Sequence, residues 1–365
     1  MLSLGPGVLS GITLGDWLRL LRENRFHISP RYWLRAASIT RTSLGNSLLR
    51  RWEDFRYARA IRATPVPAPL FVLGIWRSGT THLHNLLAKD DRLAAPNTYQ
   101  VMYPHTFLTT EWYETALFKP FIPKTRPQDN VAFGLGEPQE DEFAIANISG
   151  LSGIMTWVFP RRAEVYDRYL TFERASADEI ARWKSAMRWF IAKLAYKHRK
   201  PLVLKSPIHT CRIRMLLDLF PDAKFVHIHR NPYAVFPSAC HTNRKVVPWC
   251  ALQKRASDDI EERTLRQFGE VYERFFAERP LIPADRYCEV EFEQLERDPL
   301  GEMRRIYTEL SLPDFAHVEP VLRRYVDGLA GYKKNTFAPL PPELLRRINA
   351  LLRPCFDAWG YEMET

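Results

Sequence analysis

Residues 69–81, which read PLFVLGIWRSGTT, carry the strongest structural signal in this chain. Leu70–Leu73 is a short, wholly apolar run of the kind that forms a buried strand. Gly74 and Gly79 bracket a tight loop, and leucines at helical spacing after it predict a helix that begins near Thr80. A strand, a glycine-bracketed loop and a helix together direct backbone N–H groups and a helix N-terminus at a phosphate or a similar anion.

The spacing of this loop is that of the P-loop motif G-x-x-x-x-G-K-[ST], with one difference. Thr80 occupies the position of the lysine that reaches the β- and γ-phosphates of a nucleoside triphosphate. Arg77 is the only cation inside the loop. The loop can therefore hold an anion, but it lacks the lysine of a triphosphate hydrolase. The alternative is an ordinary strand-to-helix turn.

Three further strands are predicted along the chain, and two of them end at a cation. Leu202–Leu204 runs into Lys205, Phe225–Ile228 is followed by Arg230, and Tyr287–Phe292 forms the fourth strand. Strands that alternate with helices predict a three-layer α/β/α fold with a central parallel sheet, like that of P-loop nucleotide hydrolases. Ligands of open parallel sheets bind outside the carboxyl ends of the strands. We therefore expect the loop and both cations at one sheet edge, as a site for a polyanionic ligand.

The R-S-G-T-T-x-L run, together with the strand before it, resembles the 5′-phosphosulfate loop of sulfotransferases. These enzymes transfer a sulfuryl group from 3′-phosphoadenosine-5′-phosphosulfate to an acceptor, without the triphosphate lysine and without magnesium. Arginine within the loop is usual in the tyrosylprotein-type members and in many bacterial ones. The resemblance implies that the co-substrate is bound by the loop residues Arg77, Ser78, Gly79, Thr80 and Thr81.

Arg230 and Ser238 are eight residues apart, the separation at which sulfotransferases hold the 3′-phosphate of the donor. The H-R-N-P segment around Arg230 resembles the H-R-D-P of the bacterial branch. Lys205, in L-K-S-P-I-H, resembles the family's lysine after the second core strand, which with Arg77 would stabilise the departing 5′-phosphate. From the residues alone, Arg230 has the alternative role of capping a helix or pairing with an acid.

An acceptor hydroxyl must also lose its proton, and two candidates for the base are present. His209 lies four residues after Lys205, and an imidazole is suited to proton transfer near neutral pH. The alternative is a carboxylate of Glu140, Asp141 or Glu142, since tyrosylprotein-type members use a glutamate. These acids follow Pro138, which predicts a helix that begins there.

Two later segments extend the resemblance, which covers about residues 69–335. Residues 289–295, EVEFEQL, resemble the family's V-x-Y-E-D-L strand, with Phe292 in place of tyrosine. Residues 331–335, GYKKN, resemble its W-K-N loop, which implies that Lys334 covers the 3′-phosphate. The P-Q-E-D-E and K-S-P-x-H segments place the pattern nearest to the bacterial branch, similar to tyrosylprotein-type sulfotransferases.

Composition narrows the class of protein. The 365 residues carry a formal net charge of +10, which favours anionic partners without choosing among a nucleotide, an acidic surface and nucleic acid. Five scattered cysteines without a C-x-x-C pair argue against a disulfide framework or a zinc site and fit a reducing compartment. Neither a signal peptide nor a transmembrane run is recognisable. These features predict a soluble, cytoplasmic protein.

Residues 1–64 differ from the rest of the chain, with eleven arginines, no lysine and four acids. They predict two short amphipathic helices, around Trp17–Leu21 and Tyr32–Ala36. One interpretation is an arm that touches a membrane surface or an anionic acceptor, and the other is a set of helices packed on the main domain with a solvated arginine face. We expect residues 1–64 to be a helical extension on or beside a sulfotransferase domain of residues 65–365.

The combined prediction is a metal-independent transfer of a sulfuryl group from 3′-phosphoadenosine-5′-phosphosulfate to a hydroxyl or amine. Aromatic and apolar residues around 99–122 and 143–159 suggest a hydrophobic small molecule or lipid as acceptor, and nucleic acid is not expected as a partner. The oligomeric state is left open. One alternative is a P-loop kinase or nucleotide hydrolase, and a second is a non-catalytic protein that binds an anion or nucleic acid.

Overall fold

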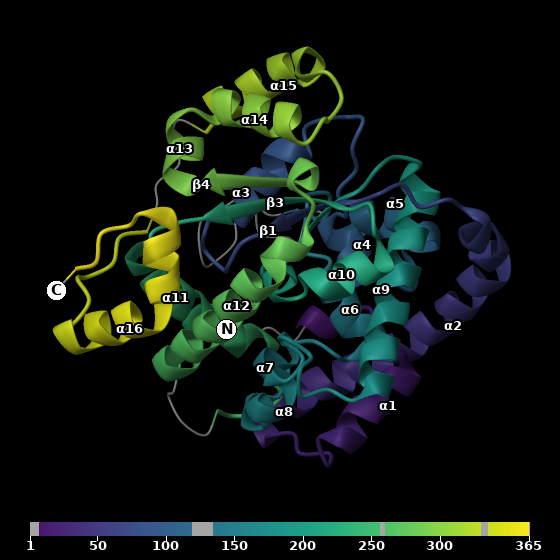
Figure 1. Cartoon of the computed structure of the whole chain (residues 1–365). Helices are drawn as coiled ribbons and strands as arrows, with labels where there is room; N and C mark the ends of the chain where they lie inside the picture. The colour runs from purple at the N-terminus through teal and green to yellow at the C-terminus, as the bar shows by residue number, and fades with distance from the viewer. Residues whose placement is uncertain (1–6, 119–133, 256–259, 330–334, 365) are drawn as a thin grey trace. The chain divides into compact units, whose positions relative to one another are not determined.

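The computed structural model describes residues 7–118, 134–255, 260–329 and 335–364 (Figure 1). The chain divides into two compact units. Unit 1 consists of Met1–Pro67, Pro96–Lys200 and Arg244–Asp258, and unit 2 consists of Ala68–Ala95, Pro201–Asn243 and Asp259–Thr365.

Unit 2 is built on a four-stranded sheet in which every pair of neighbouring strands is parallel. The order is β2-β1-β3-β4, so β1 lies between the second and third strands of the chain. The carboxyl ends of all four strands therefore meet at one edge, which is the edge the sequence predicted for a ligand. The strands are β1 Leu70–Leu73, β2 Val203–Lys205, β3 Lys224–His229 and β4 Tyr287–Glu291.

Helices cover both faces of this sheet. Successive residues of a strand point to opposite faces, so each strand packs side chains against both helix layers. Val72 and Val226 face a core shared with α3 (Thr80–Leu87), α14 (Pro299–Glu309) and α15 (Phe315–Asp327). Phe71 and Phe225 face the other side, where their rings stack 5.6 Å apart. That side is covered by the short 3-10 helix η5 (Pro207–Cys211), α10 (Ile213–Leu219) and α12 (Ile260–Glu278). The predicted three-layer α/β/α fold with a parallel sheet is confirmed (Figure 1).

The remaining elements of unit 2 follow the strand ends. α11 (Pro232–Cys250) starts after β3, and its residues from Arg244 onward belong to unit 1. α13 (Phe292–Arg297) starts directly after β4, and α16 (Pro342–Trp359) packs against α12. The 3-10 helices η6 (Arg279–Leu281) and η7 (Ala284–Arg286) connect α12 to β4.

The described part of unit 1 is helical. Its longest helices pack together through a buried ion pair between Glu53 and Lys193, and Lys193 Nζ also donates to Pro104 O at 2.7 Å. Burial lowers the pKa of Lys193 to about 8, against the opposing effect of Glu53. The helices are η1 Gly7–Leu9, α1 Leu14–Glu23, η2 Pro30–Tyr32, α2 Trp33–Ala63, α4 Thr98–Met102, α5 Phe107–Phe118, α6 Glu142–Ser149, α7 Met155–Val158, η4 Pro160–Arg162, α8 Ala163–Asp167 and α9 Ala177–His198.

Two sequence-based helix boundaries were wrong. The helix predicted over Tyr32–Ala36 continues as α2 to Ala63. The helix expected from Pro138 begins only at Glu142, as α6. Residues 137–139 pair instead with residues 96–98, where the amide of Thr98 donates to Glu137 O and the amide of Gln139 donates to Pro96 O, both at 2.9 Å. A backbone committed to that bridge cannot make helical hydrogen bonds.

The division at residue 65 into an extension and a sulfotransferase domain stays a prediction. Residues 1–67 belong to unit 1 together with residues 96–200. Among the helices that the structure describes, none combines the length and the apolar character needed to cross a bilayer.

Candidate functional site

Two glycines in the loop between β1 and α3 adopt positive φ angles, and neither position has room for a side chain. Gly74 has φ +139° and Gly79 has φ +101°, in the region that side chains disfavour. A Cβ atom on Gly74 would lie 2.4 Å from Ile228 O, and one on Gly79 would lie 2.3 Å from Cδ2 of Phe292. The loop is therefore pressed against the ends of β3 and β4, so its backbone lies at the predicted ligand edge.

Arg77 is held in a left-handed conformation, with φ +73°, which is uncommon for a residue with a side chain. Its Nε donates a hydrogen bond to Ser238 Oγ of α11 at 3.0 Å. Nη1 of Arg230 lies 3.5 Å from Arg77 O. The structure therefore brings Arg77 close to Arg230 and Ser238. The sequence analysis assigned Arg77 to the 5′ end of one nucleotide, and it assigned Arg230 and Ser238 to the 3′ end.

The first turn of α3 and the end of β2 also meet at this edge. Thr80 is the first residue of α3, so Thr80 and Thr81 lie where helix N–H groups lack partners within the helix. The buried Lys205 points its Nζ at Thr81 Oγ1, 3.4 Å away. Ser78 is buried, and its hydroxyl donates to Ile75 O at 2.8 Å. Ser78 thus helps to hold the loop shape in this structure.

Two residues to which the sequence analysis assigned no role in the site support this edge. Thr210, on η5, accepts a hydrogen bond from the amide of Gly74 through Oγ1 at 2.8 Å. Phe292 lies under Arg230, whose guanidinium carbon is 4.1 Å from the ring centroid. The available signals were a hydroxyl residue shortly after Lys205 and an aromatic residue at the end of the fourth strand. Neither signal indicates which residue the side chain contacts in the folded protein.

Burial lowers the pKa of Arg230 below its ordinary value, and the neighbouring carboxylates oppose that effect. Arg230 Nε lies 3.9 Å from Glu293 Oε1, which is a long and loose ion pair. Arg230 therefore does have an acidic neighbour, as the alternative interpretation of the sequence predicted, but the ion pair is weak. The guanidinium stacks on Phe292, and its contacts with Glu293 and Arg77 O are long, so it retains donors for a phosphate.

The two candidate bases lie in different units, and each is described within its own unit. His209 belongs to unit 2, on η5, where it is buried with its ring edge-on to Phe71 at 5.5 Å. Glu142 belongs to unit 1 as the first residue of α6, where its carboxylate accepts a hydrogen bond from Ser152 Oγ at 2.6 Å. Both roles stay predictions. Lys334 lies outside the described residues, and its predicted role is untested.

The end of β3 next to Arg230 depends on a buried histidine. The His229 ring stacks on Trp359, with centroids 4.6 Å apart and planes within 2°. Its Nδ1 lies 2.9 Å from the hydroxyl of Tyr361. Burial lowers the pKa of His229 from 6.5 to about 4, and the nearby His227 adds to the shift. The folded state therefore resists a proton that the unfolded chain accepts.

This shift predicts that the protein loses stability in acid. Between pH 6.5 and about 4 the unfolded state binds the proton and the folded state does not, so the free energy of unfolding falls as the pH falls. The loss from His229 is about 3 kcal/mol over that window. Urea unfolding at a series of pH values should show a shallower pH dependence for His229→Asn than for the unmodified chain. Equal slopes would contradict the assignment.

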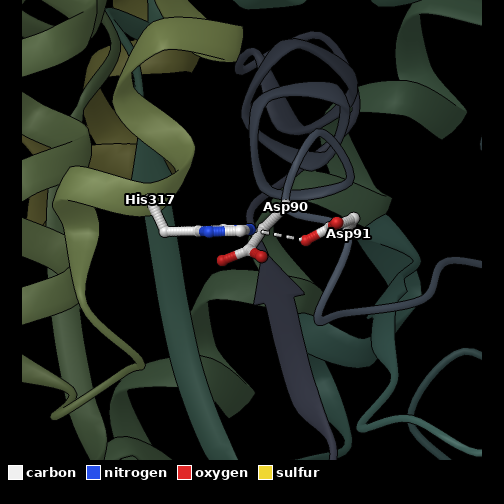
Figure 2. Close-up of side chains that lie close together, drawn as sticks. All are labelled: Asp90, Asp91 and His317. Atoms are coloured by element: carbon white, nitrogen blue, oxygen red, sulfur yellow. Dashed lines mark hydrogen bonds and ion pairs between the residues drawn. The ribbon is translucent and has the colours of Figure 1, made fainter.

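Among the described residues, one group of acids and histidine has metal-ligand spacing, namely Asp90, Asp91 and His317 (Figure 2). It lies beyond the C-terminal end of α3, away from the glycine loop. Asp90 already accepts hydrogen bonds from Arg92 at 2.7–2.9 Å and from Tyr307 at 2.8 Å. His317 Nε2 and Asp91 Oδ1 are 2.8 Å apart. The group is accounted for by these contacts, and the arginine beside Asp90 would oppose a cation.

Fold and site together define a P-loop-like α/β protein with a glycine loop, Lys205 and Arg230 gathered at one edge of its sheet. The model of the sulfotransferase family matches residues 69–317 of this chain. The chain is 35% identical over 357 residues to proteins of Mycobacterium bovis and Mycobacterium tuberculosis, each named omega-hydroxy-beta-dihydromenaquinone-9 sulfotransferase Stf3. The match covers 97% of this chain and 91% of each relative.

Solved structures agree in fold. The crystal structure of sulfotransferase STF9 from Mycobacterium avium has a TM-score of 0.72 at 22% identity, covering 98% of this chain and 94% of that one. Sulfotransferase STF1 from Mycobacterium tuberculosis has a TM-score of 0.62 at 21% identity, covering 94% and 88%. The chain belongs to the sulfotransferase family and is a sulfotransferase. This assignment decides against the kinase and the non-catalytic alternatives.

Proposed function

We propose that this enzyme transfers the sulfuryl group of 3′-phosphoadenosine-5′-phosphosulfate to a hydroxyl, or an amine, of a hydrophobic small molecule. The observation that supports the donor is the convergence of anion-binding groups at one sheet edge. Arg77 contacts Ser238 directly, and Arg230 contacts the Arg77 carbonyl. Groups this close together can bind one compact ligand with phosphates at both the 3′ and 5′ positions.

In this proposal the donor spans two anion sites. The backbone of residues 77–81 and the hydroxyls of Thr80 and Thr81 hold the 5′-phosphosulfate at the start of α3. Arg230 and Ser238 hold the 3′-phosphate, with Phe292 orienting the guanidinium. Arg77 would exchange its contact with Ser238 for one with the donor. Lys334 keeps its predicted place over the 3′-phosphate.

The transfer itself is an in-line displacement at sulfur. The acceptor oxygen forms a bond to sulfur while the bond from sulfur to the 5′-phosphate oxygen breaks, which leaves a sulfate ester and adenosine 3′,5′-bisphosphate. Negative charge builds on the departing phosphate, and Lys205 and Arg77 stabilise it. The acceptor proton passes to His209, with Glu142 as the alternative. These protein cations would perform the charge stabilisation without a metal.

For the acceptor, we infer a hydrophobic molecule with a hydroxyl group. The relatives from Mycobacterium bovis and Mycobacterium tuberculosis are named for an omega-hydroxy-dihydromenaquinone, which is such a molecule. We also propose a cytoplasmic location, since all five cysteines are buried and unbridged. A screen of lipid and aqueous cell extracts with sulfur-labelled donor would test the acceptor class. Label found only in water-soluble products would overturn it.

Adenosine 3′,5′-bisphosphate is expected to raise the melting temperature without added magnesium, and ATP is expected to do little. A ligand at 100 times its Kd stabilises the folded state by about 2.7 kcal/mol. Arg230→Gln should lose most of that stabilisation. Arg286→Gln is the matched control, because Arg286 precedes β4 at the opposite sheet edge. Equal stabilisation by ATP with magnesium, or an unchanged response of Arg230→Gln, would contradict the proposed donor site.

A further inference from the structure

The outward face of α2 exposes a stripe of large apolar side chains. Leu44, Leu48, Trp52 and Phe55 are 54%, 61%, 55% and 84% exposed. Steps of four, four and three residues place them on one side of the helix over three turns. Single exposed apolar residues are ordinary, but a contiguous stripe marks an interaction surface.

This stripe is not the side of α2 that packs into the core of unit 1. The opposite side of α2 is already buried within unit 1, through Arg35, Ile39, Asn46, Glu53 and Ile61. Asn46 donates to the carbonyls of Ser10 and Ile12 at 2.8 and 3.0 Å, and Glu53 pairs with Lys193. The helix therefore has two apolar-containing sides, one inside unit 1 and one in solvent.

The charges beside the stripe are almost all positive. Arg41, Arg51, Arg59 and Arg62 are exposed, and they form no ion pair with any residue in the described part of the chain. The acids of α2 are neutralised locally: Glu53 is buried against Lys193, and Asp54 lies 3.5 Å from Arg50. The outward surface of α2 therefore combines apolar side chains with uncompensated arginines.

α5 carries further exposed apolar side chains in unit 1. The amide of Thr109, in its first turn, donates to Glu53 Oε1 at 2.8 Å, which anchors α5 beside the middle of α2. Trp112 and Leu117 of α5 are 79% and 62% exposed. Every phenylalanine and tryptophan that is more than half exposed in the described chain lies in unit 1: Phe26, Trp33, Trp52, Phe55 and Trp112.

We propose that the outward face of α2 docks unit 1 onto an anionic lipid bilayer. The leucine, tryptophan and phenylalanine stripe on α2, flanked by arginines, combines the apolar and basic side chains with which a surface binds the membrane interface. Its apolar side chains enter the headgroup boundary, and the arginines pair with anionic headgroups. The proposal assigns the membrane contact that was predicted for residues 1–64 to one face of α2. It does not depend on the proposed reaction.

The test is co-sedimentation of the full chain, without donor or acceptor, with vesicles. We expect binding to vesicles of equal parts phosphatidylcholine and phosphatidylglycerol, and much weaker binding to pure phosphatidylcholine. The double variant Trp52→Glu with Phe55→Glu should lower the partition coefficient by about 100-fold. The matched control is Leu281→Glu with Val321→Glu, which places the same charges on exposed apolar positions of unit 2 and should bind normally.

The arginines provide a second test. Arg41→Gln and Arg59→Gln should each weaken binding to the anionic vesicles about fivefold, and added salt should weaken it further. Arg346→Gln, on the exposed side of α16, is the matched control. Unchanged melting temperatures would show that the variants remain folded. Wild-type binding by the double variant, or a stripe-dependent dimer in sedimentation without vesicle binding, would overturn the proposal.

Discussion

Lys205→Met is expected to lower kcat by about 100- to 1000-fold while leaving the affinity for adenosine 3′,5′-bisphosphate within a few-fold of wild type. Lys205 is buried at the end of β2, and its Nζ lies 3.4 Å from Thr81 Oγ1 at the start of α3. In the proposed mechanism, a cation held there in a low-dielectric setting would act mainly on charge that develops as the sulfur–oxygen bond breaks. Its contribution should therefore appear in kcat rather than in ground-state binding.

Lys224→Met is the matched control for this experiment. Lys224 begins β3 at the opposite end of the sheet, where its Nζ donates to the carbonyl of Ser311 at 3.2 Å. The same substitution there should cost some stability and leave kcat near wild type. Single-turnover measurement of labelled product would separate chemistry from product release. A Lys205→Met enzyme with normal single-turnover kinetics would remove Lys205 from the transfer step.

His209→Ala is expected to lower kcat by about 10²- to 10⁴-fold with nearly unchanged nucleotide affinity, because a positioned base contributes that much to proton transfer. His209 is buried against Phe71, so His209→Gln serves as a second variant that fills more of the site. The comparison of kcat with KM adds a measurement that a structural role would not reproduce: loss of the base should lower kcat and leave KM near wild type.

Glu142→Gln is the paired experiment, since an amide can still accept the hydrogen bond from Ser152. If His209 is the base, Glu142→Gln should keep turnover within a few-fold of wild type. Retained activity in both His209 variants, together with a large loss in Glu142→Gln, would transfer the role to the carboxylate. Both enzymes should bind adenosine 3′,5′-bisphosphate, which separates loss of chemistry from loss of folding.

Local sequence signals were enough to predict the candidate site of this protein. The apolar run Leu70–Leu73, the glycines of the loop and the cations at two later strand ends are each readable within a few residues. The rule that parallel strands end at one edge then places Lys205 and Arg230 beside the loop, without knowledge of strand order. The contact between Arg77 and Ser238 agrees with that reasoning.

Features that depend on distant partners could not be read in this way. Thr210 supports Gly74 from 136 residues away, and nothing in its own neighbourhood indicates that role. The late start of α6 follows from a bridge with residues 96–98, so propensity at Pro138 was overruled by a tertiary hydrogen bond.

The apolar pattern of α2 shows the same division. The amino-acid order establishes that Leu44, Leu48, Trp52 and Phe55 share one side of a helix, because helical periodicity is a local property. Which side of that helix is buried depended on the fit of Asn46 and Glu53 against residues far along the chain. Packing of this kind is a sum over distant contacts, so only the folded chain reveals that the stripe faces solvent.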